Sequence, residues 1–161
     1  MSSTGILTAD MKRVVEEQRL GFVATVGPDG APNLSPKGTF VVLDDEHLAF
    51  ADLRSPNTTR NIAAGSAVEI NFVDPFARKG FRFFGHAAVL APESEGFAAA
   101  MAAAPALKRT EGRARAIITV RVERAAPLIS PAYDTGATEA ELRRSWASHF
   151  RSLQPGGRFP D

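Results

Sequence analysis

Short segments with the hydrophobic pattern of β-strands recur along this sequence. Seven of them show an alternation of apolar and polar positions or a run of β-branched and aromatic residues, and turn-forming residues separate them. The predicted strands cover residues 20–26, 31–36, 39–43, 47–51, 67–73, 80–90 and 116–122. The first four follow one another through tight turns, which predicts antiparallel pairing. Because strands and helices do not alternate regularly, the pattern favours a mainly β barrel or sandwich of six or so strands over a parallel sheet.

Four other segments have the spacing, composition or end signals of helices. The predicted helices cover residues 8–19, 55–65, 93–104 and 138–150. Ser55 and Pro56 open the second helix, with Ser55 predicted as its N-cap, and Gly65 ends it. The fourth begins with a Thr-x-x-Glu capping box. Residues 127–133 are predicted to be irregular, and the Pro- and Gly-rich residues 154–161 to be loose.

No repeat, low-complexity block or linker divides the sequence, so we expect one domain over residues 1–161 with a helical extension from about residue 133. The 19 basic and 18 acidic residues leave a net charge of +1, which argues against nucleic acid or an acidic membrane as a partner. The chain has no cysteine, which excludes disulfides, thiolate nucleophiles and zinc–thiolate sites. Its three histidines lie in different predicted elements, so we expect no metal site.

Targeting segments and common catalytic motifs are not evident in the sequence. The first residues lack the basic and apolar regions of a signal peptide, and no apolar run approaches the ~20 residues that cross a bilayer. We therefore expect a cytoplasmic protein without a membrane partner. No Walker loop, G-x-S-x-G elbow or G-x-G-x-x-G turn follows a predicted strand, which removes the main support for hydrolase, P-loop and dinucleotide-binding functions.

The helix start at Ser55 is a candidate anion site. The free backbone N–H groups of a first helical turn and the positive end of the helix dipole both favour an anion. Asn57 and Thr58 add side-chain donors at the same place. The alternative is that Ser55 simply caps its own helix.

Two basic features accompany that helix start. Lys37 lies beside Gly38, where another group can approach the backbone closely, and its ammonium suits a phosphate or the edge of an electron-rich ring. Arg78, Lys79 and Arg82 lie at a strand entrance, and arginine binds phosphate in a bidentate manner. Lys37 could instead be a solvated residue at a bulge, and the three cations a solvated loop.

Tyr133 and Trp146 mark a further region near the C-terminus. A single tryptophan in a predicted helix is commonly part of helix packing. The alternative is that this segment covers a flat aromatic ligand, and the sequence leaves both readings open.

Together these segments resemble the pyridoxamine 5'-phosphate oxidase-like family of FMN-binding split-barrel proteins. The resemblance runs from about residue 11 to residue 122, and the order and spacing of its short pieces carry it. The pieces are Gly21-Phe22-Val23-Ala24-Thr25-Val26 with the Asp29-Gly30 turn, Ser35-Pro36-Lys37-Gly38-Thr39-Phe40, Leu48-Ala49-Phe50-Ala51-Asp52, Asn57-Thr58-Thr59-Arg60-Asn61-Ile62, and Arg78-Lys79-Gly80-Phe81-Arg82-Phe83-Phe84-Gly85.

The resemblance implies a six-stranded antiparallel split barrel with Greek-key character. It also implies a homodimer that binds two FMN molecules at its interface. The residues that it places along the flavin are Ser35, Lys37 and Gly38, with Ala51 and Asp52 beside them. The residues that would meet the ribityl phosphate are Ser55, Asn57, Thr58 and Asn61. The cations that would come from the partner subunit or complete the phosphate site are Arg78, Lys79 and Arg82.

We therefore expect an FMN-binding flavoprotein, and from its resemblance an oxidoreductase that acts on an unidentified small molecule. True pyridoxamine phosphate oxidases carry an Arg-x-His-x-Arg-like element near the C-terminus, which this chain lacks, so we do not expect it to make pyridoxal phosphate. Pro56 and Asn57 replace the basic pair of the family's phosphate helix, which leaves the deazaflavin F420 and an F420-dependent reductase open. A flavin or haem carrier or sensor without turnover also stays open, because no acid or base is evident near the expected ring.

Overall fold

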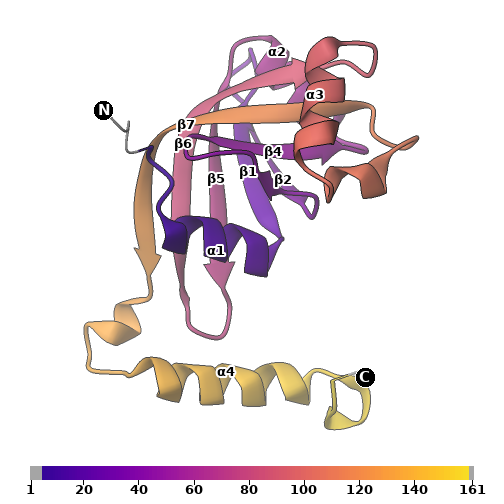
Figure 1. Cartoon of the computed structure of the whole chain (residues 1–161). Helices are drawn as coiled ribbons and strands as arrows, with labels where there is room; N and C mark the ends of the chain where they lie inside the picture. Colours follow the sequence, from indigo (N-terminus) through magenta and orange to yellow (C-terminus); the bar gives the residue numbers. More distant parts are fainter. Residues whose placement is uncertain (1–4, 160–161) are drawn as a thin grey trace.

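A computed structural model describes residues 5–159, and one curled antiparallel sheet of seven strands forms its body (Figure 1). The strands are β1 (Gly21–Val26), β2 (Pro32–Lys37), β3 (Val41–Val42), β4 (His47–Asp52), β5 (Ala67–Asp74), β6 (Lys79–Leu90) and β7 (Ala116–Ile129). Their order across the sheet is β2-β1-β5-β6-β7-β4-β3. The expected mainly β, antiparallel architecture is confirmed, with seven strands in place of the six that the resemblance implied.

Four α-helices and three short 3₁₀ turns accompany the sheet. The helices are α1 (Ala9–Gln18), α2 (Pro56–Ala63), α3 (Glu95–Ala103) and α4 (Glu139–Ser152), and the 3₁₀ turns are Leu107–Thr110, Pro131–Tyr133 and Pro155–Gly157. Part of the C-terminal segment that we predicted to be loose therefore forms a turn, and its residues 160–161 lie outside the described residues. Within residues 5–159, no helix combines the length and apolar character needed to cross a bilayer.

Chain connectivity explains why the sheet curls. Lys37 ends one edge strand and Val41 begins the opposite edge strand, and four residue steps span at most about 14 Å. The two edges must therefore approach each other at this point. The Thr39 hydroxyl accepts from the Ala51 N–H at 3.0 Å and donates to the Ala51 carbonyl at 3.2 Å, which fastens the crossing segment to β4. The result is a curled sheet that stays open between its edges.

Aromatic side chains fill the inside of the curl. Phe40 lies between Phe50 and Phe72, with ring centroids 4.9 Å from each, and Phe72 contacts Phe83 at 6.3 Å. The helix α1 packs against this core through Val14 and Val15. A second, smaller cluster joins β4 and β7 to α3 and the 3₁₀ turn after it. This second cluster fixes the α3 region beside the segment that crosses from β2 to β3.

The last strand extends beyond its predicted end. We expected a strand to residue 122 and irregular structure from residue 127, but β7 continues to Ile129. It pairs with β4 only as far as Arg121, while its pairing with β6 continues through Pro127. The Val122 N–H still donates to the Glu46 carbonyl at 2.8 Å, and beyond it β6 is the neighbour with which the strand pairs, so Pro127 lies on a sheet edge, where a proline is tolerated.

Candidate functional site

Lys37 and Asp52 lie near each other, without a direct ion pair, where β2 and β4 border the opening in the sheet. The strand β3 pairs only with Leu48 and Ala49, so the last residues of β4 face the opening. Both charged side chains are buried, with exposed fractions of 9% for Lys37 and 4% for Asp52. A side chain built at Gly38 would find no atom within 4 Å, so open space begins directly beside Lys37.

The ammonium group of Lys37 has capacity for a further hydrogen-bond acceptor. Burial lowers its pKa, and the negative charge of Asp52 partly offsets that effect. Its Nζ donates to the Ser35 hydroxyl. Among the residues that the structure describes, no carboxylate oxygen lies within 4.0 Å of Nζ. Because an ammonium has three donors, Lys37 can still bind a carbonyl or phosphate oxygen.

Asp52 organises the loop that leads into α2. Its Oδ1 accepts from the Ser55 backbone N–H at 2.8 Å and from the Ser55 hydroxyl at 2.5 Å. Its Oδ2 accepts from the Thr59 hydroxyl at 3.1 Å. The hydrogen bonds of this carboxylate therefore all hold the segment that leads into α2.

The first turn of α2 keeps free backbone donors. Ser55 occupies the N-cap position, but our prediction that its side chain caps the helix is wrong, because its hydroxyl donates to Asp52. No side chain caps this helix in the described structure. Asn57 is exposed, and its side-chain oxygen accepts from Arg60 at 2.5 Å. The backbone N–H groups at the start of α2 are thus left for another acceptor.

Thr58 and Asn61 face the sheet. Thr58 is 1% exposed, and its hydroxyl accepts from the Asn33 side-chain amide at 3.1 Å. Asn61 is buried as well. Its side-chain amide donates to the Thr25 hydroxyl at 3.1 Å, and the same hydroxyl also accepts from the Asn33 amide at 3.1 Å. These two residues of α2 therefore dock the helix onto β1 and β2, and their side chains have protein partners.

Thr25 and Asn33 complete that network, and the sequence analysis did not identify them. The usable signal lay in the strand pattern, because Asn33, Ser35 and Lys37 form the polar set of alternate residues in β2. In a strand with one buried face, the polar residues commonly meet solvent. Here they face into the curl, and Leu34 on the opposite face is 65% exposed.

Within this chain, Arg78 and Lys79 lie beyond the end of β5 that is far from α2, and all three cations of the second basic segment have other partners. Strand β5 runs from the end of α2 to the turn that holds Arg78, a rise of about 23 Å over its eight residues (Figure 1). Arg78 lies over the Trp146 ring at 4.2 Å, and Lys79 donates to Glu139 at 3.2 Å. Arg82 lies 3.6 Å from Glu69 on the neighbouring strand. One chain therefore does not bring these cations to the Lys37–Asp52 site.

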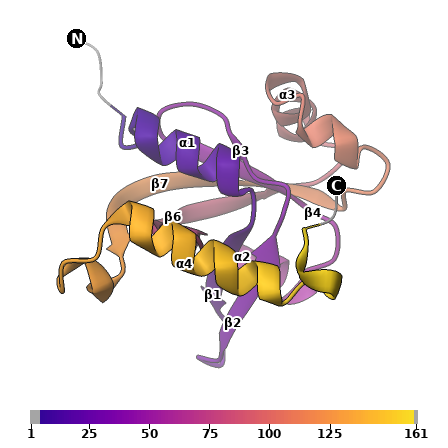
Figure 2. The ribbon, with the colours of Figure 1, turned by 90° about the horizontal axis from the view of Figure 1, so that it is seen from below.

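The tryptophan belongs to α4, which lies apart from the body of the sheet in Figure 1 and in front of it in the view from below (Figure 2). This helix packs on the turn between β5 and β6 through a Phe76–Phe150 contact at 5.4 Å and an Arg143–Asp74 ion pair at 2.8 Å. The Tyr133 hydroxyl adds a hydrogen bond of 2.6 Å to the Ala77 carbonyl. Of the two readings left open by the sequence, Trp146 takes part in helix packing in this chain.

The donors around Lys37 match the acceptors of a flavin mononucleotide. That ligand carries a phosphate, ribityl hydroxyls and ring carbonyls. The uncapped start of α2 supplies N–H groups for a phosphate, and the incompletely paired Lys37 ammonium supplies charge-assisted donors for ring carbonyls. The open backbone at Gly38 leaves room for a flat ring. The chemistry of the residues present therefore fits this cofactor.

Comparisons with known proteins agree with the architecture. The family model described as pyridoxamine 5'-phosphate oxidase matches residues 7–128. The crystal structure of HupZ from Group A Streptococcus is 32% identical, covers 76% of this chain and 94% of its own, and superposes with a TM-score of 0.67. Among curated proteins, no sequence matches the chain.

Two further solved structures extend the similarity. The first is a protein from Lactobacillus delbrueckii that has been assigned as a pyridoxamine 5'-phosphate oxidase. It is 25% identical over 78% of this chain and 97% of its own, with a TM-score of 0.64. A structure titled F420 reductase is 25% identical over 74% of this chain and 98% of its own, with a TM-score of 0.56. A family model over most of the chain and a curled antiparallel sheet shared with these structures lead to one conclusion: the chain belongs to the pyridoxamine 5'-phosphate oxidase family.

Proposed function

We propose that this protein is an FMN-dependent oxidoreductase whose cofactor lies at the opening between β2 and β4. One observation carries the proposal: the buried Lys37 ammonium, without a carboxylate in contact, lies beside a helix start that no side chain caps. Burying an ammonium without a full set of partners costs free energy. Such an arrangement is typical of a site that awaits an anionic or carbonyl-bearing ligand.

Each residue of the site has a distinct role in this proposal. Lys37 donates to the pyrimidine edge of the ring, where a positive charge favours the reduced cofactor. Asp52 holds Ser55 and therefore the first turn of α2 in place for the phosphate. The bound FMN supplies the redox chemistry, accepting or giving a hydride or single electrons. The chain positions the ring and excludes water from its edge.

Cofactor binding is the first test. Flavin-free protein is titrated with FMN and, separately, with riboflavin, which lacks the phosphate, and both are followed by flavin fluorescence. We expect FMN to bind at micromolar concentration and riboflavin at least tenfold more weakly, because the start of α2 binds the phosphate. An absence of FMN binding at micromolar concentration would overturn the proposal.

The deazaflavin F420 is the second candidate cofactor. Two observations favour it: the similarity to a structure titled F420 reductase and the lack of a basic residue among Pro56, Asn57 and Thr58 in the first turn of α2. The same titration with F420 distinguishes the two cofactors. Rapid reduction by NADH, NADPH or reduced substrate in stopped-flow then separates an oxidoreductase from a carrier without turnover.

A homodimer completes the proposal. The outer face of β2, β1 and β5 exposes Phe22, Val26, Leu34 and Val73, with exposed fractions between 42% and 65%. Phe22 pairs with Asn71 across β1 and β5, so both side chains lie on this face. The Asn71 Oδ1 atom is buried without a hydrogen-bond partner in the described structure. A second copy would cover the apolar surface and supply the missing donor.

A further inference from the structure

A pocket next to the proposed cofactor site lies where the segment from β2 to β3 meets α1 and the region after α3. Its volume is about 420 Å³, within the range of sites for small molecules. Its lining includes Gly38 and Leu53, the residues that directly follow Lys37 and Asp52. The pocket therefore adjoins the site that we propose for the flavin.

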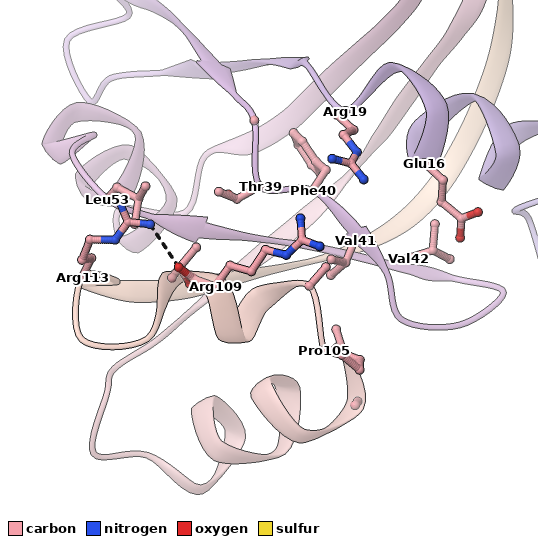
Figure 3. Close-up of a pocket in the computed structure, with 15 residues that line it drawn as sticks. Glu16, Arg19, Thr39, Phe40, Val41, Val42, Leu53, Pro105, Arg109 and Arg113 are labelled. Carbon is pink, nitrogen blue, oxygen red and sulfur yellow. Dashed lines mark hydrogen bonds between the residues drawn. The ribbon is translucent and has the colours of Figure 1, made fainter.

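The floor of this pocket is apolar. Phe40, Val41, Val42 and Leu53 line it from the sheet side, and Pro105 closes it from the side of α3 (Figure 3). Two of these residues, Phe40 and Val41, belong to the buried core and are held there by packing. The floor is thus a fixed apolar surface that suits the hydrocarbon or ring part of a ligand.

Three arginines form the rim of the pocket. They are Arg19, Arg109 and Arg113. Figure 3 shows the guanidinium groups of Arg19 and Arg109 directed into the same space above Phe40 and Val41. Arg113 donates to the Arg109 carbonyl at 3.0 Å, which ties two of the arginines together.

The three pocket arginines, like most arginines among the described residues, hold no ion pair. Arg13, Arg82 and Arg143 each have a carboxylate within 4.0 Å. Over residues 5–159, Arg19, Arg109 and Arg113 have none, although Glu16 lines the same pocket. Three like charges around one small volume repel one another, and an anion placed between them would remove that repulsion. Guanidinium groups are also the side chains best suited to carboxylate and phosphate oxygens.

We infer that this pocket binds the substrate of the protein, and that the substrate is a small molecule with an apolar or aromatic body and a carboxylate or phosphate group. The apolar floor would hold the body, and Arg19, Arg109 and Arg113 the anionic group. Its role as a substrate site rests on the proposed flavin function, because a substrate must lie next to the flavin that we place at Lys37. The binding of an anionic ligand can be measured independently of the flavin.

The test uses flavin-free protein and isothermal titration calorimetry. Phenyl phosphate and benzoate serve as anionic probes, and benzyl alcohol serves as a neutral probe of similar size. We expect at least one anion to bind and benzyl alcohol to bind at least tenfold more weakly. Anion affinity should also fall as the salt concentration rises, because the contact is between charges.

Matched variants locate the site. Arg109→Gln and Arg113→Gln should each weaken anion binding about tenfold or more, whereas Arg144→Gln, which removes an exposed arginine of α4, should leave it unchanged. FMN titration of the same variants should give the affinity of the unaltered protein. Equal binding of benzyl alcohol and both anions, or unchanged anion binding by both pocket variants, would overturn the inference. A failure of the unaltered protein to bind FMN would instead overturn the proposed function and the pocket's role as a substrate site, while the anion-binding result would still stand.

Discussion

Lys37 carries its charge in a place that is nearly closed to solvent. The residue is 9% exposed, lies 6.0 Å from the centre of the Phe50 ring and has the Ser35 hydroxyl as its hydrogen-bond partner. A protein that needed only stability would place an apolar side chain there, because a partly paired buried charge is destabilising. The residue is therefore explained better by a ligand than by the fold.

Replacing Lys37 with methionine should separate binding from stability. Lys37→Met keeps the length of the side chain but removes its charge. We expect it to weaken FMN binding by about 1–3 kcal/mol, because a charge-assisted contact is lost. We also expect the free energy of unfolding at neutral pH to rise by about 1 kcal/mol, because the burial of a charge is avoided. Flavin titration and urea unfolding measure the two effects, with exposed Lys108→Met as the control.

The pH dependence of that stability change has a definite sign. Burial lowers the pKa of Lys37 below its ordinary value near 10.5, so between the two values the unfolded chain binds more protons than the folded chain. The unaltered protein therefore gains stability relative to Lys37→Met as pH rises through this window. The advantage of the variant should be largest at neutral pH and shrink toward pH 10.5. Equal FMN affinity in both proteins would identify Lys37 as a structural residue.

At the scale of elements, the position of α2 depends on the buried network around Thr25. One hydroxyl accepts both the Asn33 and the Asn61 side-chain amides, each at 3.1 Å. Thr58 adds a second acceptor for Asn33. Because the start of α2 is the proposed phosphate site, this network of the sheet also fixes the geometry of the cofactor site.

Removing the shared acceptor should cost more than a typical surface change. Thr25→Val preserves shape but leaves the Asn61 amide without its acceptor, so we expect a loss of about 2–3 kcal/mol in the free energy of unfolding. FMN affinity should fall as well, because α2 is no longer held in its position on β1 and β2. Chemical unfolding and flavin titration test both effects, and Thr119→Val on β7 is the matched control. A loss below about 0.5 kcal/mol would mean that α2 is held chiefly by apolar contacts.

For the whole molecule, the exposed outer face of β2, β1 and β5 is the main feature that a single chain leaves unexplained. Leu34 and Phe22 lie on this face, and the buried Asn71 Oδ1 lacks a donor there. Arg78 and Lys79 contact α4 and Tyr133 in their own chain, at the end of β5 far from α2, as expected if they serve the site of a partner. A homodimer accounts for both observations.

A charge on that face should prevent dimer formation. Leu34→Glu places a carboxylate in the apolar patch, so we expect a monomer by analytical ultracentrifugation at concentrations where the unaltered protein is a dimer. FMN binding should weaken at the same time if both chains contribute to the site. Leu153→Glu is the control, because Leu153 is 63% exposed but lies beyond α4. A monomeric unaltered protein would contradict the proposal.

Local patterns in the sequence were sufficient for most of the elements. The alternation in β1, the capping box of α4 and the Ser55-Pro56 helix start all lie where they were predicted. The end of β7 was not predictable in this way. Whether Pro127 ends a strand depends on which neighbours the strand has, and β7 has only β6 at that point.

The sequence by itself determined the antiparallel strands, because these follow from short-range periodicity, and the order of its short motifs carried the resemblance that implied the family and the candidate flavin residues. Only the tertiary structure decided which of those residues act together. It joined Asp52 to Ser55 and Lys37 to Ser35, turned Thr58 toward Asn33 and Asn61 toward Thr25, and held Arg78 and Lys79 against α4. It also brought Arg109 beside Arg19, which is 90 positions away in the chain. The physical reason is the curl of the sheet, which sets long-range neighbours that no local pattern encodes.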